Sequence, residues 1–271
     1  KEGPSFDLAI AIAMLAATEQ APLDVLDHFI FIGELGLDGS IRPVKGILPL
    51  AMAMKKSNRS LITSSENGVE ASISGTPSYA FQTLKEVIDF LYNPDSCTPL
   101  PQPNIAKLLA EAPTTSIDFS DIKGQHEAKR AMEIAAAGGH NIIMIGSPGA
   151  GKTMLARALP SIMPPLSIGE CLECSEIHSI AGLLSSNHPL ITERPFRSPH
   201  HTSSQASLIG GGRIPTPGEV SLSHNGILFM DEFPEFQKNV LEALRQPLED
   251  GFVTISRVNA QFTFPCNFLL V

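Results

Sequence analysis

The feature that most constrains this 271-residue sequence is a glycine-rich stretch that matches the pattern G-x-x-x-x-G-K-[ST]. It follows an apolar segment, residues 141–145, that we expect to form a buried strand. It opens a segment, residues 152–159, that we expect to form a helix ending near Pro160. A strand, a loop and a helix in this order predict an α/β fold with a parallel sheet. The stretch comprises Gly146, Ser147, Pro148, Gly149, Ala150, Gly151, Lys152 and Thr153.

This loop carries the residue types that a bound triphosphate requires. Glycines permit a tight turn whose backbone N–H groups face a phosphate, and the N-terminus of the following helix adds about half a positive charge. We expect Lys152 to reach the β- and γ-phosphates of ATP and Thr153 to bind Mg²⁺. The alternative is a glycine-rich turn that binds nothing, which the flanking strand and helix disfavour.

An acidic pair, Asp231 and Glu232, follows a second apolar segment at residues 227–230. In open α/β sheets, ligands bind at the carboxyl ends of the strands. We therefore expect Asp231 to hold Mg²⁺ through its water shell and Glu232 to orient or deprotonate the attacking water. Taken alone, the pattern fits a strand followed by two solvated acids equally well. Together with the phosphate loop, it indicates a site for nucleotide hydrolysis.

Extra structure must lie between these two motifs, because far more residues separate them than the roughly 30 of a minimal βαβ unit. Residues 210–218 are rich in glycine and proline, which is typical of an exposed loop or hairpin tip. Such a stretch either carries function or is a surface excursion without a role. The chain ends at residues 268–271 in what reads as a third buried strand, so we expect both ends to be truncations.

The N-terminal part of the chain predicts a separate α/β domain over residues 1–94, followed by a proline-rich linker over residues 95–116 and by the phosphate-loop domain over residues 117–271. Asp38-Gly39 is a turn signal between two strand patterns. The expected helices cover residues 6–18, 46–56 and, in the linker, 104–111. The expected strands cover residues 28–34, 40–44 and 60–63.

The composition of the chain restricts which kinds of partner and which cellular compartment we expect for it. A formal net charge of −9 argues against a whole-surface electrostatic grip on DNA or RNA, so any nucleic-acid contact must be local. No apolar run reaches the roughly 18 residues that indicate a membrane span. The four cysteines do not form a disulfide framework, which favours a reducing cytoplasm. Cys171 and Cys174 form an isolated C-x-x-C without the further ligands that a metal site needs.

Several motifs resemble those of known families. Residues 118–125 (DFSDIKGQ) resemble the segment that lines the adenine pocket of AAA+ ATPases, which assigns Ile122 and Gly124 to nucleotide binding. Three longer motifs resemble the magnesium-chelatase-like ComM/YifB family of AAA+ proteins. They are residues 194–202 (RPFRSPHHT), residues 217–226 (PGEVSLSHNG) and residues 231–236 (DEFPEF).

This resemblance implies a bacterial, cytoplasmic AAA+ ATPase that uses ATP and Mg²⁺ and forms a ring, expected to be a hexamer. ComM-type members act as DNA helicases that aid recombination during natural transformation. In this clade an insert projects toward the central pore, and Ser204–Gly218 falls where that insert is expected. Arg213 is the candidate DNA contact, with a capping or solvated arginine as the equal alternative. For the adjacent His200 and His201, a structural or interface role is favoured over metal binding.

The first segment resembles the Lon-type protease domain. Residues 2–5 (EGPS) match the surroundings of that family's serine nucleophile, and residues 33–44 match the hairpin that follows. The place of the family's catalytic lysine falls on Leu48, whereas Lys45 comes three positions too early. A serine needs an adjacent base to become nucleophilic, so we expect Ser5 to cap the following helix instead. The resemblance then implies a peptidase-like domain used for assembly or partner binding.

Three functions stay open at this point: an ATP-driven DNA motor, a chelatase- or chaperone-like protein remodeller, and an ATP-dependent Lon-like peptidase. The AAA+ resemblance places the sensor residues and the arginine finger beyond Val271. We therefore expect this chain by itself to bind nucleotide weakly and to hydrolyse it poorly.

Overall fold

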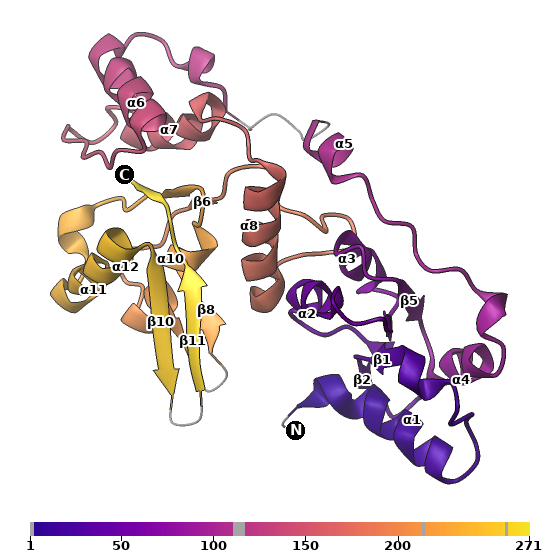
Figure 1. The fold of residues 1–271 in the computed structure, drawn as a ribbon. Helices are drawn as coiled ribbons and strands as arrows, with labels where there is room; N and C mark the ends of the chain where they lie inside the picture. Colours follow the sequence, from indigo (N-terminus) through magenta and orange to yellow (C-terminus); the bar gives the residue numbers. More distant parts are fainter. Residues whose placement is uncertain (1–2, 111–116, 213–214, 258–259) are drawn as a thin grey trace. The chain divides into compact units, whose positions relative to one another are not determined.

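The computed structural model describes residues 3–110, 117–212, 215–257 and 260–271. The chain divides into two compact units (Figure 1). The first comprises Lys1–Ile105 and His178–Leu190, and the second comprises Ala106–Ile177 and Ile191–Val271. Each unit contains helices and a parallel sheet, so the predicted α/β class is confirmed. Within the described part of the chain, no helix is long and apolar enough to cross a membrane.

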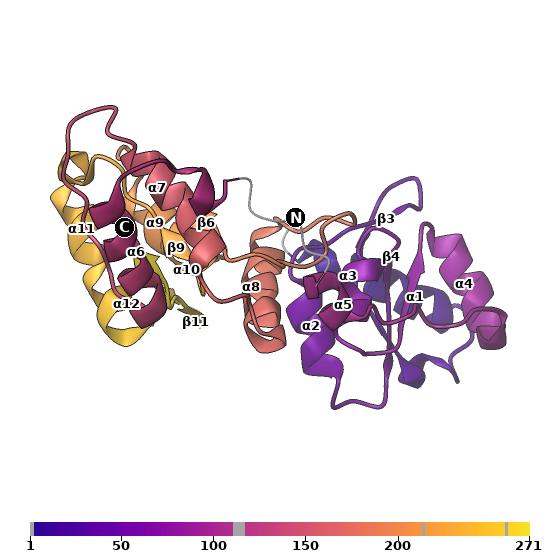
Figure 2. The ribbon, with the colours of Figure 1, turned by 90° about the horizontal axis from the view of Figure 1, so that it is seen from above.

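The first unit is built on a parallel sheet with the strand order β1-β4-β5, covered by helices on both faces (Figure 2). Successive residues of β4 point to opposite faces. Ile62 packs with the apolar side chains of α1 and α4, whereas Leu61 packs with those of α2 and α3. The strands are β1 (Phe29–Phe31), β4 (Ser60–Ser64) and β5 (Ser78–Phe81), and the helices are α1 (Asp7–Ala17), α2 (Ile47–Met54), α3 (Gly68–Ile73) and α4 (Leu84–Tyr92).

A predicted hairpin in this unit is confirmed. It joins β2 (Glu34–Leu35) to β3 (Ile41–Arg42), and its turn contains Gly39 with φ of 83°, a left-handed conformation that glycine adopts without strain. The 3-10 turns of the unit are η1 (Pro4–Phe6), η2 (Leu26–His28) and η3 (Pro94–Ser96). The short helix predicted after the proline-rich segment is α5 (Ile105–Ala110).

Two expectations for the first unit are wrong. The strand expected over residues 28–34 ends at Phe31, because Gly33 leaves the sheet and donates its N–H to the Ser5 carbonyl oxygen at 3.0 Å. Ser5 is not a helix cap, because it lies inside η1 and no side-chain cap bond is made at the start of η1 or α1. Leu48, in the place of the family's lysine, is fully buried in α2.

A segment distant in sequence completes the first unit. Ser179 accepts the Gly46 N–H at its carbonyl oxygen (3.0 Å) and donates its hydroxyl to Glu70 Oε1 at 2.5 Å. The same carboxylate oxygen accepts the Leu48 N–H at 3.3 Å. Burial raises the pKa of Glu70, although these hydrogen bonds oppose the shift. Residues 178–190 are thereby tied to the first unit by both backbone and side-chain hydrogen bonds.

The second unit is organised around a parallel sheet with the strand order β12-β9-β6. These strands are β6 (Phe196–Arg197), β9 (Ile227–Leu228) and β12 (Leu269–Leu270). A core that includes Ile227, Leu269, Leu155 and Met132 joins the sheet to the neighbouring helices. The helices are α6 (His126–Gly138), α7 (Lys152–Ala158), α8 (Ile168–Ala181), α9 (Gln205–Ile209), α10 (Glu219–Leu222), α11 (Lys238–Ala243) and α12 (Arg245–Asp250), with 3-10 turns η4 (Phe119–Asp121), η5 (Leu159–Ile162) and η6 (Phe233–Glu235).

The expectation of a buried strand at residues 141–145 is wrong in part. The segment runs beside β12, where the Ile142 N–H donates to the Leu270 carbonyl oxygen at 2.9 Å, but it has no strand assignment. Ile143 and Ile145 are 77% and 92% exposed. Their apolar character predicted burial, but within the described residues this segment is part of no sheet, so no sheet neighbours cover these two side chains.

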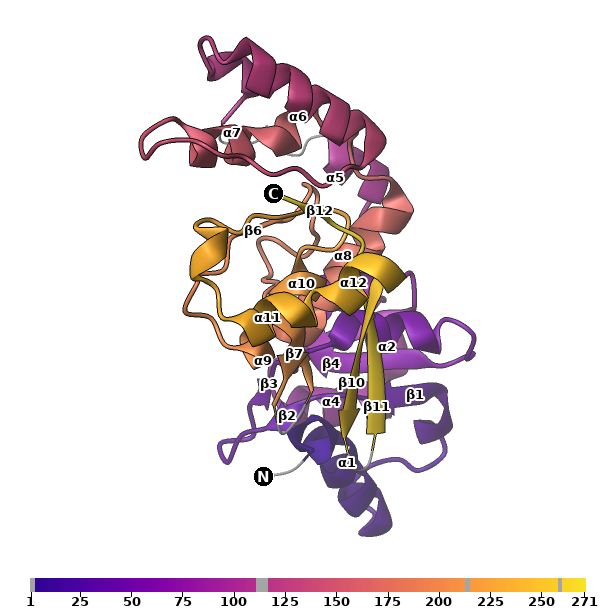
Figure 3. The same cartoon turned by 90° about the vertical axis from the view of Figure 1, so that its left-hand side faces the viewer.

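Two hairpins extend the second unit. The glycine-rich stretch forms β7 (Gly210–Gly211), which pairs antiparallel with β8 (Thr216–Pro217), so the predicted hairpin is confirmed. Arg213, the candidate DNA contact, lies outside the described residues. The longer hairpin of β10 (Phe252–Arg257) and β11 (Ala260–Pro265) was not expected (Figure 3). Its signal is the alternation in which Val253 and Ile255 are buried.

A buried histidine ties the end of α10 to the segment before β12. His224 Nδ1 accepts the Asn267 N–H at 3.0 Å, and its Nε2 lies 3.2 Å from Glu173 Oε2. A ring whose Nδ1 accepts a backbone hydrogen bond carries its proton on Nε2, which points the N–H at the carboxylate. Burial lowers the pKa of His224 in spite of Glu173.

This histidine predicts a pH-dependent stability. Its pKa is lower in the folded chain than the unfolded value of about 6.5, so the unfolded chain binds the proton first as pH falls. Its contribution is fully present above about pH 6.5 and declines below that value. Urea unfolding at pH 7.5 and pH 5.5 should therefore show a smaller loss of stability for His224→Asn than for the original chain. An equal loss in both would contradict this assignment.

Candidate nucleotide site

The phosphate loop has an open backbone conformation. Gly149 and Gly151 have φ of 78° and 86°, in the left-handed region that glycine adopts without strain. A Cβ built on either residue would meet no atom within 4 Å, so the space beside the loop is clear. Helix α7 begins at Lys152, directly after the loop, as the motif requires. The backbone thus has the form that a phosphate cradle needs.

The ammonium group of Lys152 folds back over this loop. Its Nζ donates to the carbonyl oxygens of Gly146 and Ser147 at 2.7 and 3.0 Å. These bonds hold the positive charge at the mouth of the loop, and two carbonyl oxygens are weaker partners for an ammonium than an anionic phosphate. We therefore expect the Lys152 ammonium to give up these two carbonyl oxygens when phosphate oxygens are available.

The two predicted motifs meet at the next residue. Thr153 Oγ1 donates to Asp231 Oδ2 at 3.2 Å, although the two residues are 78 positions apart in the sequence. Asp231 follows β9, the central strand of the described sheet, and Thr153 lies in the first turn of α7. A hydroxyl and a carboxylate are the hard oxygen ligands that Mg²⁺ accepts, so this pair fits the predicted ion.

Glu232 makes different contacts from those of Asp231. Its backbone has φ of 55°, which is uncommon for a residue other than glycine, and its N–H donates to Asp231 Oδ1 at 3.1 Å. Its Oε2 lies 3.3 Å from Nδ1 of His201. The sequence did not predict this contact, because it joins two loops and follows no periodic pattern.

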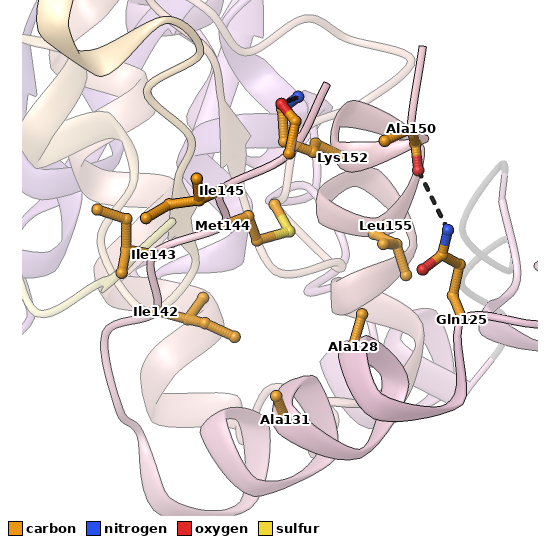
Figure 4. A pocket seen from close by; sticks show the side chains of 11 residues that line it. Gln125, Ala128, Ala131, Ile142, Ile143, Met144, Ile145, Ala150, Lys152 and Leu155 are labelled. Atoms are coloured by element: carbon orange, nitrogen blue, oxygen red, sulfur yellow. Dashed lines mark hydrogen bonds between the residues drawn. The ribbon is translucent and has the colours of Figure 1, made fainter. Parts of the chain in front are cut away.

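A cavity of about 250 Å³ lies beside the phosphate loop (Figure 4). Gln125, at the start of α6, lines it together with Lys152 and donates its amide to the Ala150 carbonyl oxygen at 3.4 Å. Of the residues predicted to contact adenine, Ile122 is buried in the core, and Gly124 precedes Gln125 with φ of 68°. Neither lines this cavity, whereas the next residue does.

The long motifs of the sequence analysis contact one another. Arg197 binds the Glu219 carboxylate with two hydrogen bonds of 2.6 and 2.8 Å. Arg194 donates to the carbonyl oxygens of Pro164 and Asn225 at 2.5 and 2.6 Å. These guanidinium groups therefore bind β6 and the segment just before it to their neighbours, which gives both arginines a structural role.

The cysteines of the C-x-x-C and the paired histidines are residue types that can bind metals. Within the ranges that the structure describes, no three or more His, Cys, Asp and Glu side chains gather as a metal site would require. Cys171 and Cys174 are both fully buried in α8. Burial raises the pKa of Cys174 to about 12, which makes this thiol inert near neutral pH.

The same residues match a known family. Residues 118–271 match the family described as "Magnesium chelatase, subunit ChlI", and residues 1–67 match "Subunit ChlI of Mg-chelatase". The chain belongs to this family. This match confirms the resemblance found in the sequence.

Relatives of the ComM/YifB type match the whole chain. It is 45% identical to the "Competence protein ComM" of Haemophilus influenzae and 44% identical to the "Uncharacterized protein YifB" of Salmonella typhimurium. Each match covers 100% of this chain and 53% of the relative, so the chain spans about half the length of these relatives. Among solved structures, one of the complex between subunits BchI and BchD of magnesium chelatase is 23% identical, with a TM-score of 0.46, over 58% of this chain and 54% of the other.

The thiols provide a direct test of this structure. Cys97 is exposed, whereas Cys171, Cys174 and Cys266 are buried. We expect an aromatic disulfide reagent at pH 8 to modify one thiol per folded chain rapidly and all four after unfolding in guanidinium. The Cys97→Ser variant is the matched control and should lose the fast phase. Fast modification of two or more thiols in the folded chain would contradict the burial of the other three cysteines.

Proposed function

We propose that this chain is the nucleotide-binding part of a ring-forming AAA+ motor that hydrolyses ATP and moves DNA. The observation that carries the proposal is the hydrogen bond between Thr153 and Asp231. It brings the phosphate loop and the acidic pair to one place, as in-line attack on a terminal phosphate requires. Neither motif alone would distinguish a hydrolytic site from a turn or from two solvated acids.

Each residue has a specific task in this proposal. Backbone N–H groups of residues 146–151 bind the phosphates, and the ammonium group of Lys152 leaves its loop carbonyls to pair with the β- and γ-phosphate oxygens. Thr153 and Asp231 hold Mg²⁺, Asp231 through its water shell. Glu232 orients the attacking water and takes up its proton. When bound, Mg²⁺ neutralises the charge that develops on the phosphate oxygens.

Action on DNA is proposed from the relatives and from one structural element. The Haemophilus relative is named a competence protein, which fits a role in recombination during natural transformation. The described hairpin of β7 and β8 falls within the segment that the resemblance assigns to the insert, Ser204–Gly218, and this supports the proposal. With a net charge of −9, DNA binding must depend on such local contacts. We further infer a hexameric ring and, from the bacterial relatives, a cytoplasmic location.

The residues of the first unit support proteolysis less well than those of the second unit support ATP hydrolysis. A serine nucleophile needs a neighbouring base, and the place of the family's lysine holds Leu48, whose side chain is fully buried. The backbone carbonyl of Ser5 is engaged by Gly33, which gives this residue a structural contact. The proposal therefore leaves the first unit an assembly or partner-binding role.

The nucleotide site predicts two distinct defects in the complete protein. Lys152→Ala should weaken ATP binding about tenfold or more, because the charge that pairs with the phosphates is lost. Glu232→Gln should bind ATP with unchanged affinity and hydrolyse it about a hundredfold more slowly, because the amide cannot accept the proton of the water. A fluorescent ATP analogue measures affinity, and phosphate release measures turnover.

Two exposed residues serve as matched controls for these variants. Lys238→Ala removes an ammonium whose partner is Glu242, and Glu235→Gln changes a carboxylate three positions after Glu232. Both controls should retain affinity and turnover. The site assignment is wrong if Lys152→Ala and Glu232→Gln behave like these controls.

DNA should stimulate ATP turnover in the complete protein. We expect forked and single-stranded DNA to raise phosphate release severalfold, with an effect that weakens as salt increases. Arg213→Ala should lower DNA affinity and reduce the salt slope by about one, whereas Arg130→Ala, which removes an exposed partner of Glu133, should not. If DNA neither binds nor stimulates, a protein remodeller becomes the better proposal.

A further inference from the structure

Few contacts restrict the side chain of Glu232, the catalytic glutamate of the proposed site. The carboxylate of Glu232 is 66% exposed, and its backbone adopts a left-handed conformation directly after Asp231. A free carboxylate on a flexible side chain samples several rotamers, whereas water activation requires a single position. Its activity therefore depends on whatever neighbouring group limits its motion.

His201 is placed to do this. Among the described residues, it is the side chain whose nitrogen comes within ion-pair distance of Glu232, with Nδ1 at 3.3 Å from Oε2. The contact forms between two loops that the sheet brings together. β6 pairs in parallel with β9, with Arg197 opposite Leu228, so the segments after the two strands leave the same edge.

The ring of His201 packs against two neighbouring rings. The centroid of the His200 ring lies 4.1 Å away, and the buried Phe236 meets His201 edge-on at 6.5 Å. His200 is anchored in turn, because its Nδ1 lies 2.8 Å from the Thr202 hydroxyl and accepts the Thr202 N–H at 3.3 Å. A ring packed in this way can hold a carboxylate with little further loss of side-chain entropy.

We propose that His201 is a positioning residue that holds the Glu232 carboxylate where it activates water. The inference rests on the proposed function of Glu232 and adds a residue that does not itself touch the nucleotide. Asp231 is oriented separately, through Thr153, so the two carboxylates of the pair have different supports. Loss of the His201 contact should then impair the chemical step without impairing nucleotide binding.

The test uses a pair of substitutions at His201 in the complete protein. His201→Phe keeps a ring against His200 and Phe236 but removes the nitrogen that faces Glu232. We expect its kcat for ATP to fall about tenfold, with KM and the affinity for a fluorescent ATP analogue unchanged. His201→Asn places an amide nitrogen near the position of Nδ1, and it should recover most of the lost kcat.

Control variants separate this inference from the proposed function. His188→Phe makes the same chemical change in the other unit and should leave kcat unaltered. If Glu232→Gln abolishes turnover while His201→Phe retains or raises it, the positioning role is wrong and the proposed function stands. An asparagine variant that is as slow as the phenylalanine variant would also overturn it. If Glu232→Gln has no effect, the proposed function itself fails.

Discussion

The nucleotide chemistry that we propose for the second unit depends on one long-range hydrogen bond, from the Thr153 hydroxyl to the Asp231 carboxylate. Its donor lies in the first turn of α7, and its acceptor follows the central strand β9. Because β9 is hydrogen-bonded to β12 on one side and to β6 on the other, the position of Asp231 is set by the sheet. The phosphate loop is set by α7 and its core contacts at Leu155 and Ala158. The proposed site therefore lies where α7 meets the segment after β9, and α7 and β9 share one core.

Local patterns made much of this structure predictable. The phosphate loop, the helix that follows it and the acidic pair each occupy a short stretch whose residues determine its own conformation. The hairpin of β2 and β3 could also be predicted from the sequence, because Asp38-Gly39 separates two strand patterns. In the first unit the sequence located α1, α2, β3 and β4 to within a few residues of their ends. It overextended the strand at residues 28–34, which Gly33 interrupts, and it missed α3, β5 and α4.

The parts that sequence reasoning missed depend on tertiary contacts. The pairing of His201 with Glu232 and the bond from Gln125 to Ala150 join loops whose directions no periodicity encodes. Ile143 and Ile145 were expected to be buried from their apolar character alone, yet both are largely exposed, because burial depends on the tertiary neighbours of a segment as well as on its own residues. The hairpin of β10 and β11 is different, since alternation at Val253 and Ile255 was visible in the sequence.

The first unit is discontinuous in sequence, and this has a consequence for how the protein matures. Ser179 supplies hydrogen bonds to Gly46 and Glu70, yet it is separated from them by the phosphate loop and most of α8. Domains generally fold as the chain leaves the ribosome, in order from the N-terminus. Here the earliest-made unit must wait for residues 178–190 before its last contacts can form. While the nucleotide loop is being synthesised, the surface around Glu70 therefore still lacks the residues that cover it. During translation this surface is open to chaperone binding.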